Sequence, residues 1–167
     1  MKKLFGITTG LVALGLVSAA SAQTISPSSG SGTISSSAVV LSQSTTATCT
    51  IGGTYSIVAG KVQIVPTMSG GLCNPVIPGL PSSAIVRPYN IPWLAEVNPG
   101  STTTVRLTVG ATTVLNKPCY GTVVVPYDSV AKTITFGGEV LPPVTAGDPS
   151  CTLVSGTVTL SPGVIIL

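Results

Sequence analysis

The residues of this sequence that could do chemistry are few: four cysteines, four carboxylates and no histidine. The lack of histidine excludes Ser-His-Asp and Cys-His catalysis and removes the usual general base at neutral pH. A glycosidase-like carboxylate pair or a calcium site would need acidic side chains to converge. Nothing in the sequence indicates such convergence, since Asp128 in PYDS and Asp148 in AGDPS occupy ordinary turn contexts. We therefore predict a protein that is not an enzyme and holds no metal or cofactor.

The four cysteines, Cys49, Cys73, Cys119 and Cys151, are predicted to form two disulfides. An even number of cysteines in an exported chain usually forms disulfides, and a zinc site is disfavoured because the sequence has neither a CxxC pair nor a histidine. Three pairings are open. We favour Cys49–Cys73 with Cys119–Cys151, because each bridge then closes a local block of strands and adds about 3–4 kcal/mol by restricting the unfolded chain.

Residues 1–22 are predicted to be a cleaved signal peptide. Two lysines precede an apolar stretch over residues 4–17, and Ala20-Ser21-Ala22 forms a cleavage signal before Gln23. The apolar stretch is shorter than the roughly 20 residues that span a bilayer, and no later stretch is long enough. The mature protein is therefore expected outside the inner membrane, either extracellular, at the cell surface or in the periplasm, with no transmembrane segment.

The composition points to a function carried by the surface. Without the two signal-peptide lysines, five basic residues face four acidic ones, a net charge of +1 that does not indicate nucleic acid as a partner. Only 7% of the residues are charged and 44% are hydrophobic, against about 25% charged in an average protein. Low charge favours association with other surfaces, including copies of the same chain.

Apolar and polar residues alternate with a period of two in several short runs, and turn residues separate these runs. This pattern predicts an all-β domain, a β-sandwich or Greek-key barrel of eight to ten short antiparallel strands over residues 37–167. Residues 23–36 are rich in Ser and Gly and are expected to be a flexible N-terminal arm or a loosely held first strand. The final GVIIL is expected to be a terminal strand. The predicted core-facing positions are Val62, Ile64, Val105, Leu107, Val109, Ile134, Phe136, Val154, Val158 and Leu160.

Trp93 is the only tryptophan, and two roles are open for it. It could be a core anchor that packs near a disulfide, or an exposed contact for an apolar ligand or oil surface. The proline-rich stretch before it is predicted to be a long loop, which either crosses between sheets or carries function. The candidate apolar contact surface consists of Trp93, Ile77, Leu80, Ile91 and Leu94.

Several short motifs occur in a fixed order along the chain: ISPSS, Gly71-Leu72-Cys73, Gly79-Leu80-Pro81, Cys119-Tyr120-Gly121, TITFGG, Leu141-Pro142-Pro143 and SGTVTLSP. With the signal peptide and the four cysteines, this order resembles the bacterial secreted family called protein activator of alkane oxidation. One departure is that Trp93 does not directly follow Gly-Leu-Pro. The resemblance implies an extracellular, non-enzymatic protein that promotes hydrocarbon uptake by emulsification, and it supplies no catalytic residues.

Two functional hypotheses follow. In the first, the protein is a secreted surface-active or hydrophobic-surface-binding protein that promotes alkane emulsification and uptake, with hydrocarbon as its partner. In the second, it is a structural subunit of an extracellular fibre or matrix, in which the arm over residues 23–36 pairs with the sheet edge of a neighbouring copy.

Overall fold

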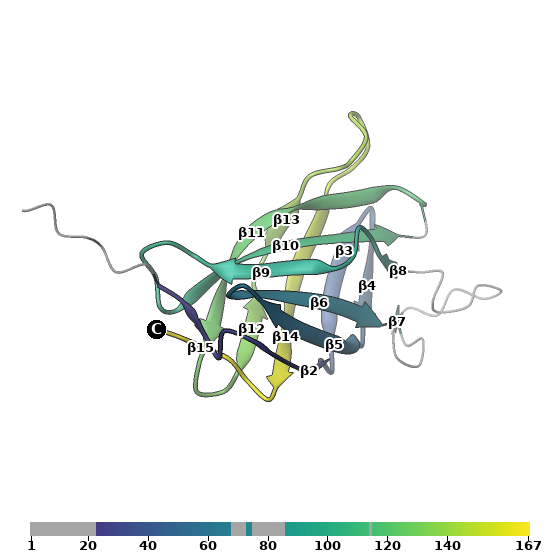
Figure 1. The fold of residues 1–167 in the computed structure, drawn as a ribbon. Helices are drawn as coiled ribbons and strands as arrows, with labels where there is room; N and C mark the ends of the chain where they lie inside the picture. Colours follow the sequence, from purple (N-terminus) through teal and green to yellow (C-terminus); the bar gives the residue numbers. More distant parts are fainter. Residues whose placement is uncertain (1–22, 68–72, 75–85, 114) are drawn as a thin grey trace, which may run out of the picture.

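The computed structural model describes residues 23–67, 73–74, 86–113 and 115–167, and all of its regular structure is β (Figure 1). The predicted signal peptide, residues 1–22, lies outside the described residues. Among the described residues, there is no helix with the length and apolarity that crossing a bilayer requires. The strands are β1 (Ile25–Ser26), β2 (Gly30–Ser35), β3 (Val39–Gln43), β4 (Thr45–Cys49), β5 (Gly52–Val58), β6 (Lys61–Thr67), β7 (Cys73–Asn74), β8 (Val86–Pro88), β9 (Trp93–Val97), β10 (Thr104–Thr113), β11 (Pro118–Asp128), β12 (Thr133–Phe136), β13 (Glu139–Leu141), β14 (Cys151–Ser161) and β15 (Ile165–Ile166).

Eight of these strands close into a barrel. The order is β12-β11-β10-β9-β6-β5-β2-β14, and the pairing of β14 with β12 completes the ring. Every pairing is antiparallel, because short turns join most neighbours. The all-β prediction is confirmed, and where the sequence left a β-sandwich or a Greek-key barrel open, the structure has a closed barrel with additional strands. The prediction of eight to ten short strands is corrected, because β10, β11 and β14 have 10 or 11 residues each.

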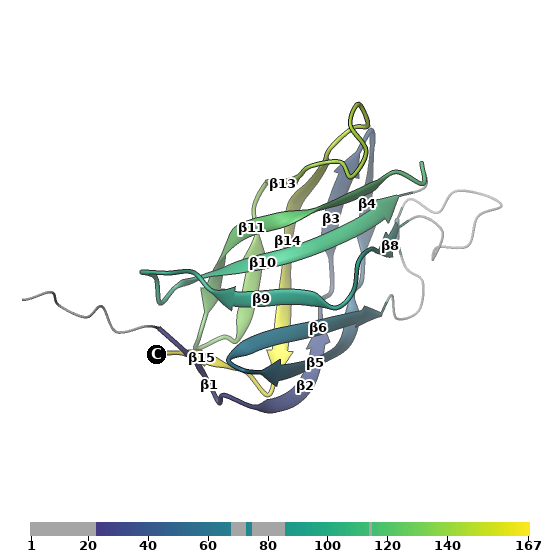
Figure 2. The same ribbon diagram turned by 45° about the horizontal axis from the view of Figure 1, so that its top comes forward.

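The long strands extend beyond the barrel and carry the additional strands. The C-terminal part of β14 pairs with β12 and β2 inside the ring, whereas its N-terminal part pairs with β13 and β3. The sheet continues from β3 through β4 to β7, and β8 adds to the far end of β10. Figure 2 shows β3 and β4 beside β14, and the turn between β13 and β14 projecting from the top of the molecule.

The core follows the predicted alternation with one exception. All the predicted core-facing residues except Val154 are buried. Val154 is 42% exposed, because the pairing of β14 with β3 shifts register between Leu153 and Ser155. Such a bulge inserts an extra residue and breaks the strict alternation, so Leu153 faces the core in place of Val154.

Residues 23–36 contain two strands, and both are paired with other strands. Strand β2 is hydrogen-bonded to β5 on one side and to β14 on the other, and Ile34 is buried. Strand β1 pairs with β15, so the expected terminal strand is present, with Ile166 buried and Ile165 exposed. An arm free to reach a neighbouring copy is therefore not a feature of this structure.

The C-terminal segment is attached to the barrel by two tyrosines. The hydroxyl of Tyr55 donates to the carbonyl of Pro162, and the hydroxyl of Tyr127 donates to the carbonyl of Val164 at 2.5 Å. Burial raises the pKa of both tyrosines above the usual value, which for Tyr127 the hydrogen bond to Val164 partly offsets. The segment that contains β15 is thereby tied to both β5 and β11.

Candidate functional site

The two disulfides have the favoured pairing, Cys49–Cys73 and Cys119–Cys151. They close loops of 24 and 32 residues. The first joins β4 to the edge strand β7, where the two cysteines are direct cross-strand partners. The second joins β11 to β14, and both of its cysteines are fully buried. The sulfurs therefore stabilise the fold and are not available as reactive groups.

Two of the four carboxylates form ion pairs with lysines. Glu96 Oε1 lies 2.5 Å from Lys61 Nζ, and Asp148 Oδ1 lies 2.7 Å from Lys117 Nζ. Both pairs are partly exposed, so each contributes little to stability. In the part of the chain that the structure describes, no cluster of three or more His, Cys, Asp or Glu side chains could hold a metal ion.

The other two carboxylates bind backbone N–H groups in turns. The Oδ1 atom of Asp128 accepts hydrogen bonds from the N–H groups of Ala131 and Val130 at 2.9 and 2.7 Å. These two bonds hold the pKa of Asp128 below its usual value. Glu139 Oε2 accepts the N–H of Gly137 at 2.8 Å. Asp128 therefore stabilises a turn, as predicted from the sequence.

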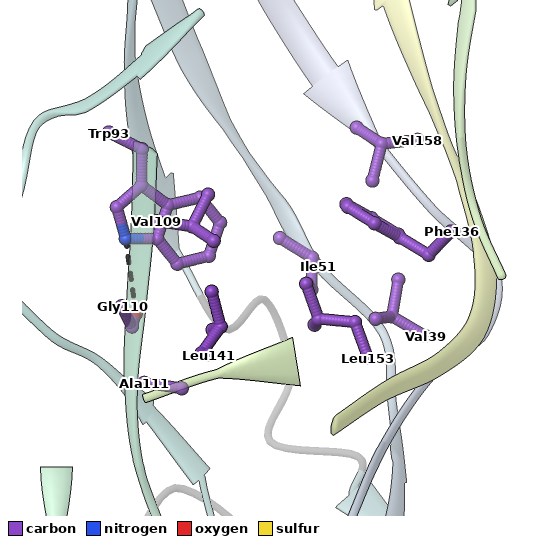
Figure 3. A pocket seen from close by; sticks show the side chains of 10 residues that line it. All are labelled: Val39, Ile51, Trp93, Val109, Gly110, Ala111, Phe136, Leu141, Leu153 and Val158. Carbon is purple, nitrogen blue, oxygen red and sulfur yellow. Dashed lines mark hydrogen bonds between the residues drawn. The ribbon is translucent and has the colours of Figure 1, made fainter. Parts of the chain in front are cut away.

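The interior of the barrel holds a small apolar cavity beside Trp93 (Figure 3). The indole N–H of Trp93 donates to the carbonyl of Gly110 at 3.1 Å and to that of Tyr89 at 3.3 Å. Figure 3 shows the indole ring on one side of the cavity and Phe136 and Val158 on the other. Trp93 is thus half-buried and packs against the core, which is the first of the two roles that the sequence left open.

The cavity is too small for a hydrocarbon ligand. Its volume is about 40 Å³, and a neighbouring cavity that shares Trp93 and Ala111 has about 30 Å³. An engineered apolar cavity that binds benzene has about 150 Å³, and ordinary ligand pockets have about 300–1,000 Å³. Neither of these two cavities could therefore hold an alkyl chain.

The residues of the predicted apolar contact surface that the structure describes differ in exposure. Ile91 is 51% exposed, whereas Leu94 is half-buried on the outer face of β9 and Trp93 faces the interior. Ile77 and Leu80 lie outside the described residues.

A different set of exposed apolar residues gathers where β13 lies against β11. An antiparallel bridge joins Cys119 to Pro143, and the N–H of Val144 donates to the carbonyl of Pro118 at 2.9 Å. Strand β13 also pairs with the first part of β14. Strands β11, β13 and β14 therefore form one continuous outer face, and β11 and β13 lie side by side in both Figure 1 and Figure 2.

This outer face carries four valines that are between 42% and 56% exposed: Val124, Val140, Val144 and Val154. We call them the valine face. Continuing the bridge register along β11 places Val140 beside Thr122, two residues from Val124. On the other side, Val140 pairs with Thr152, two residues before Val154. Val124, Val140 and Val154 thus lie on adjacent strands with Thr122 and Thr152 between them, and Val144 follows β13 after two prolines.

The charged groups near the valine face stand at its margins. Arg106 is the cross-strand partner of Val124 on β10, and the Lys117–Asp148 ion pair lies next to the segment that contains Val144. The sequence signal for this face was the uninterrupted run Val123-Val124-Val125. In such a run one side chain must point to solvent while its neighbours point to the core.

A model of the alkane oxidation protein activator family, PraA/PraB-like, matches residues 1–167, which is the whole chain. The chain belongs to this family. No curated protein matches it, and no solved structure matches it. The resemblance inferred from the sequence is therefore confirmed, and the family description is that of an activator.

Two of the motifs that carried this resemblance pack against each other in the structure. Gly121 lies beneath the ring of Pro142, and a Cβ atom on Gly121 would come within 2.8 Å of the Pro142 Cδ. The N–H of Tyr120 donates to the carbonyl of Pro142 at 3.1 Å. The Cys-Tyr-Gly and Leu-Pro-Pro motifs thus hold β11 and β13 together, and they position the valine face.

Sequence reasoning missed Gln43, which is the most buried polar side chain among the described residues, with 2% exposed. Its amide nitrogen donates to the carbonyls of Pro149 and Lys117 at 2.8 and 3.2 Å, and its amide oxygen accepts the hydroxyl of Thr113. The available signal was the alternation of VVLSQ, in which Val39, Leu41 and Gln43 share the inward face. Gln43 supports the turn that carries Asp148.

Proposed function

We propose that this alkane oxidation activator is an exported, non-enzymatic protein that adsorbs to hydrocarbon surfaces and stabilises them in dispersed form. The valine face is the observation that carries the proposal. It presents three exposed valines on the adjacent strands β11, β13 and β14 and a fourth, Val144, just after β13, and the family description connects the chain with alkane oxidation.

The valine face would supply useful adsorption energy without any pocket. Full burial of a valine side chain contributes about 1.5–3 kcal/mol. Each of the four valines still exposes about half of its surface, so burying the rest against oil would contribute about 3–6 kcal/mol. This energy raises the equilibrium constant for adsorption by roughly two to four orders of magnitude, since every 1.4 kcal/mol is a factor of ten.

The fold suits a protein that acts at an oil–water boundary. Apolar side chains of the core tend to turn towards oil, which would unfold a weakly stabilised protein at the interface. Two disulfides and a closed barrel oppose this spreading. The few charges of the chain also limit the repulsion between adsorbed copies. Disulfides further agree with export to an oxidising compartment.

The experiment is a pendant-drop measurement of hexadecane–water interfacial tension with purified, oxidised protein, together with droplet-size measurements after mixing. The test variant carries Val124→Thr, Val140→Thr and Val154→Thr, which keep the branched shape and the strand preference but add hydroxyls. A matched control carries Val58→Thr, Val65→Thr and Val130→Thr, at exposed valines outside the valine face.

We expect the wild type and the control variant to lower the interfacial tension and stabilise small droplets, and the test variant to need at least tenfold more protein for the same effect. The proposal is wrong if the oxidised wild type leaves the tension unchanged. Equal behaviour of the two triple variants would likewise remove the valine face as the contact surface.

A further inference from the structure

A second surface feature lies on the outer face of β2, β5 and β6. It is an open groove of about 380 Å³, which lies within the usual size range of ligand sites. We call it the hydroxyl groove. Its lining residues are Ser31, Gly32, Thr33, Thr54, Tyr55, Ser56, Gln63 and Val65.

The side chains of the hydroxyl groove are arranged in two cross-strand rows. Ser31 pairs with Ser56, which pairs with Gln63 on the next strand. In the neighbouring row, Thr54 stands between Thr33 and Val65. Directly opposite residues on one face of a sheet have Cβ atoms about 5 Å apart, so the polar groups form a regular grid.

Most of these polar groups make no hydrogen bond within the structure. In the part of the chain that the structure describes, the side-chain polar atoms of Ser31, Thr54, Ser56 and Gln63 have no hydrogen-bond partner. Thr33 in the same groove donates to the carbonyl of Ser161 at 3.3 Å. Four adjacent groups that both donate and accept are thus available to a ligand.

The groove contains no charged side chain. The nearest charges along β6 and β9 belong to Lys61 and Glu96, which neutralise each other at 2.5 Å. A phosphate, sulfate or uronate would find no cation to pair with in this groove. A hydrocarbon would have to desolvate hydroxyl and amide groups without replacing their hydrogen bonds, which is costly.

A peptide strand is also a poor fit. Strands β2, β5 and β6 each have a hydrogen-bonded neighbour on both sides, so there is no free edge to which an extended peptide could add. Ligands that present many neutral hydroxyl groups complement the groove best, because each of their groups also donates and accepts.

We propose that the hydroxyl groove binds a neutral oligosaccharide chain. The first row of the groove continues past Gln63 through Leu94 on β9 and Thr108 on β10 to Thr122 on β11. With strands about 4.8 Å apart, the five steps from Ser31 to Thr122 cover roughly 24 Å, which suits a linear chain of several sugar units. The row begins at Ser31, away from the valine face, and ends at Thr122, which lies beside Val140 of that face.

The test is a titration of the full mature protein with maltohexaose, cellohexaose and mannohexaose, followed by NMR, with oligogalacturonate of the same length as the charged comparison. The groove variant carries Thr54→Val and Ser56→Ala. The matched control carries Thr46→Val and Ser42→Ala on the outer face of β3 and β4, where the two hydroxyls are 3.4 Å apart.

We expect at least one neutral hexasaccharide to bind with a millimolar or lower Kd, to bind at least tenfold more weakly to the groove variant, and to bind the control variant like wild type. The proposal is overturned if no neutral hexasaccharide binds, if the two double variants lose affinity equally, or if oligogalacturonate binds more tightly. Hexadecane adsorption of the groove variant should equal that of wild type, so this outcome is independent of the proposed function.

Discussion

The amide nitrogen of Gln43 lies 2.8 Å from the carbonyl oxygen of Pro149, although 106 residues separate them in the sequence. Gln43 ends β3, and Pro149 belongs to the projecting turn between β13 and β14. The same amide group also binds Lys117 and Thr113 at the turn between β10 and β11. One buried side chain therefore joins three turns at this end of the molecule.

Replacing Gln43 by leucine keeps most of its volume but leaves the Thr113 hydroxyl and the Pro149 carbonyl without their partner. Each buried polar group left unpaired costs about 1–3 kcal/mol, so we expect Gln43→Leu to lower the free energy of unfolding by about 2–5 kcal/mol. Urea denaturation measures this change. The matched control is Gln63→Leu, since the side chain of Gln63 has no partner among the described residues.

The double variant Gln43→Leu with Thr113→Val separates the hydrogen bond from the packing. Removing both partners leaves fewer buried groups unpaired. The double variant should therefore lose less free energy of unfolding than the two single variants lose in sum. Strict additivity of the two changes, or a loss below 0.5 kcal/mol in Gln43→Leu, would contradict the role assigned to Gln43.

The two disulfides should differ in their contribution to stability even though their loops are similar in length. Restriction of the unfolded chain gives about 3–4 kcal/mol for each. Cys119–Cys151 is fully buried, and Cys119 Sγ accepts a contact from the Gln43 amide at 3.2 Å. We therefore expect Cys119→Ala with Cys151→Ala to lose more stability in urea than Cys49→Ala with Cys73→Ala. The opposite order would show that the edge bridge at β7 controls unfolding.

The alternation of apolar residues was sufficient to predict the class of fold and most of the core. Strands with strict period two, such as those containing Leu107 and Ile134, face the core as predicted. Barrel closure could not be predicted in this way, because it depends on the pairing of β14 with β12, which is set by strand tilt and stagger rather than by local pattern. Val154 was misplaced for a related reason, since a bulge is not visible in an alternating sequence.

The surface was harder to predict than the core. Trp93 was a reasonable candidate for an apolar contact, but its N–H needs a buried acceptor, and the carbonyl of Gly110 provides one inside the barrel. Val140 and Val124 are not neighbours in sequence, and only the contact of β13 with β11 brings them onto one face. The sequence could therefore indicate that function lies on the surface, but not on which face.

The tyrosines that hold the C-terminal segment should make stability fall at alkaline pH. Burial raises the pKa of Tyr127 above 10.0, so the folded protein keeps the proton at a pH where the unfolded chain loses it. The stabilisation is complete below pH 10.0 and is lost as pH rises from there through the folded pKa. Over this range, each such tyrosine lowers the free energy of unfolding by up to about 1.4 kcal/mol per pH unit.

Urea denaturation of wild type and Tyr127→Phe at pH 7 and between pH 9 and 11.5 tests this expectation. At pH 7 the variant should lose about 0.5–1.5 kcal/mol because the hydrogen bond to Val164 is absent, and this difference at pH 7 is the reference for the measurements at higher pH. Above pH 10 the decline should be shallower in the variant. An identical decline in both proteins would mean that Tyr127 does not contribute to alkaline unfolding.

Ala111 lines both interior cavities. A larger side chain at this position tests whether hydrocarbon contacts the outside of the barrel or enters its interior. Ala111→Val fills part of this space with branched carbon, so we expect the free energy of unfolding to stay level or rise by about 0.5–1 kcal/mol. If hydrocarbon contacts only the outside of the barrel, this variant should lower hexadecane–water interfacial tension as well as wild type does. A variant that folds with wild-type stability but no longer acts on hexadecane would instead require the barrel to open and admit an alkyl chain beside Trp93. Because the valine-face variant changes only exposed residues and Ala111→Val changes only a buried one, the two results together identify which side of the barrel wall meets the oil.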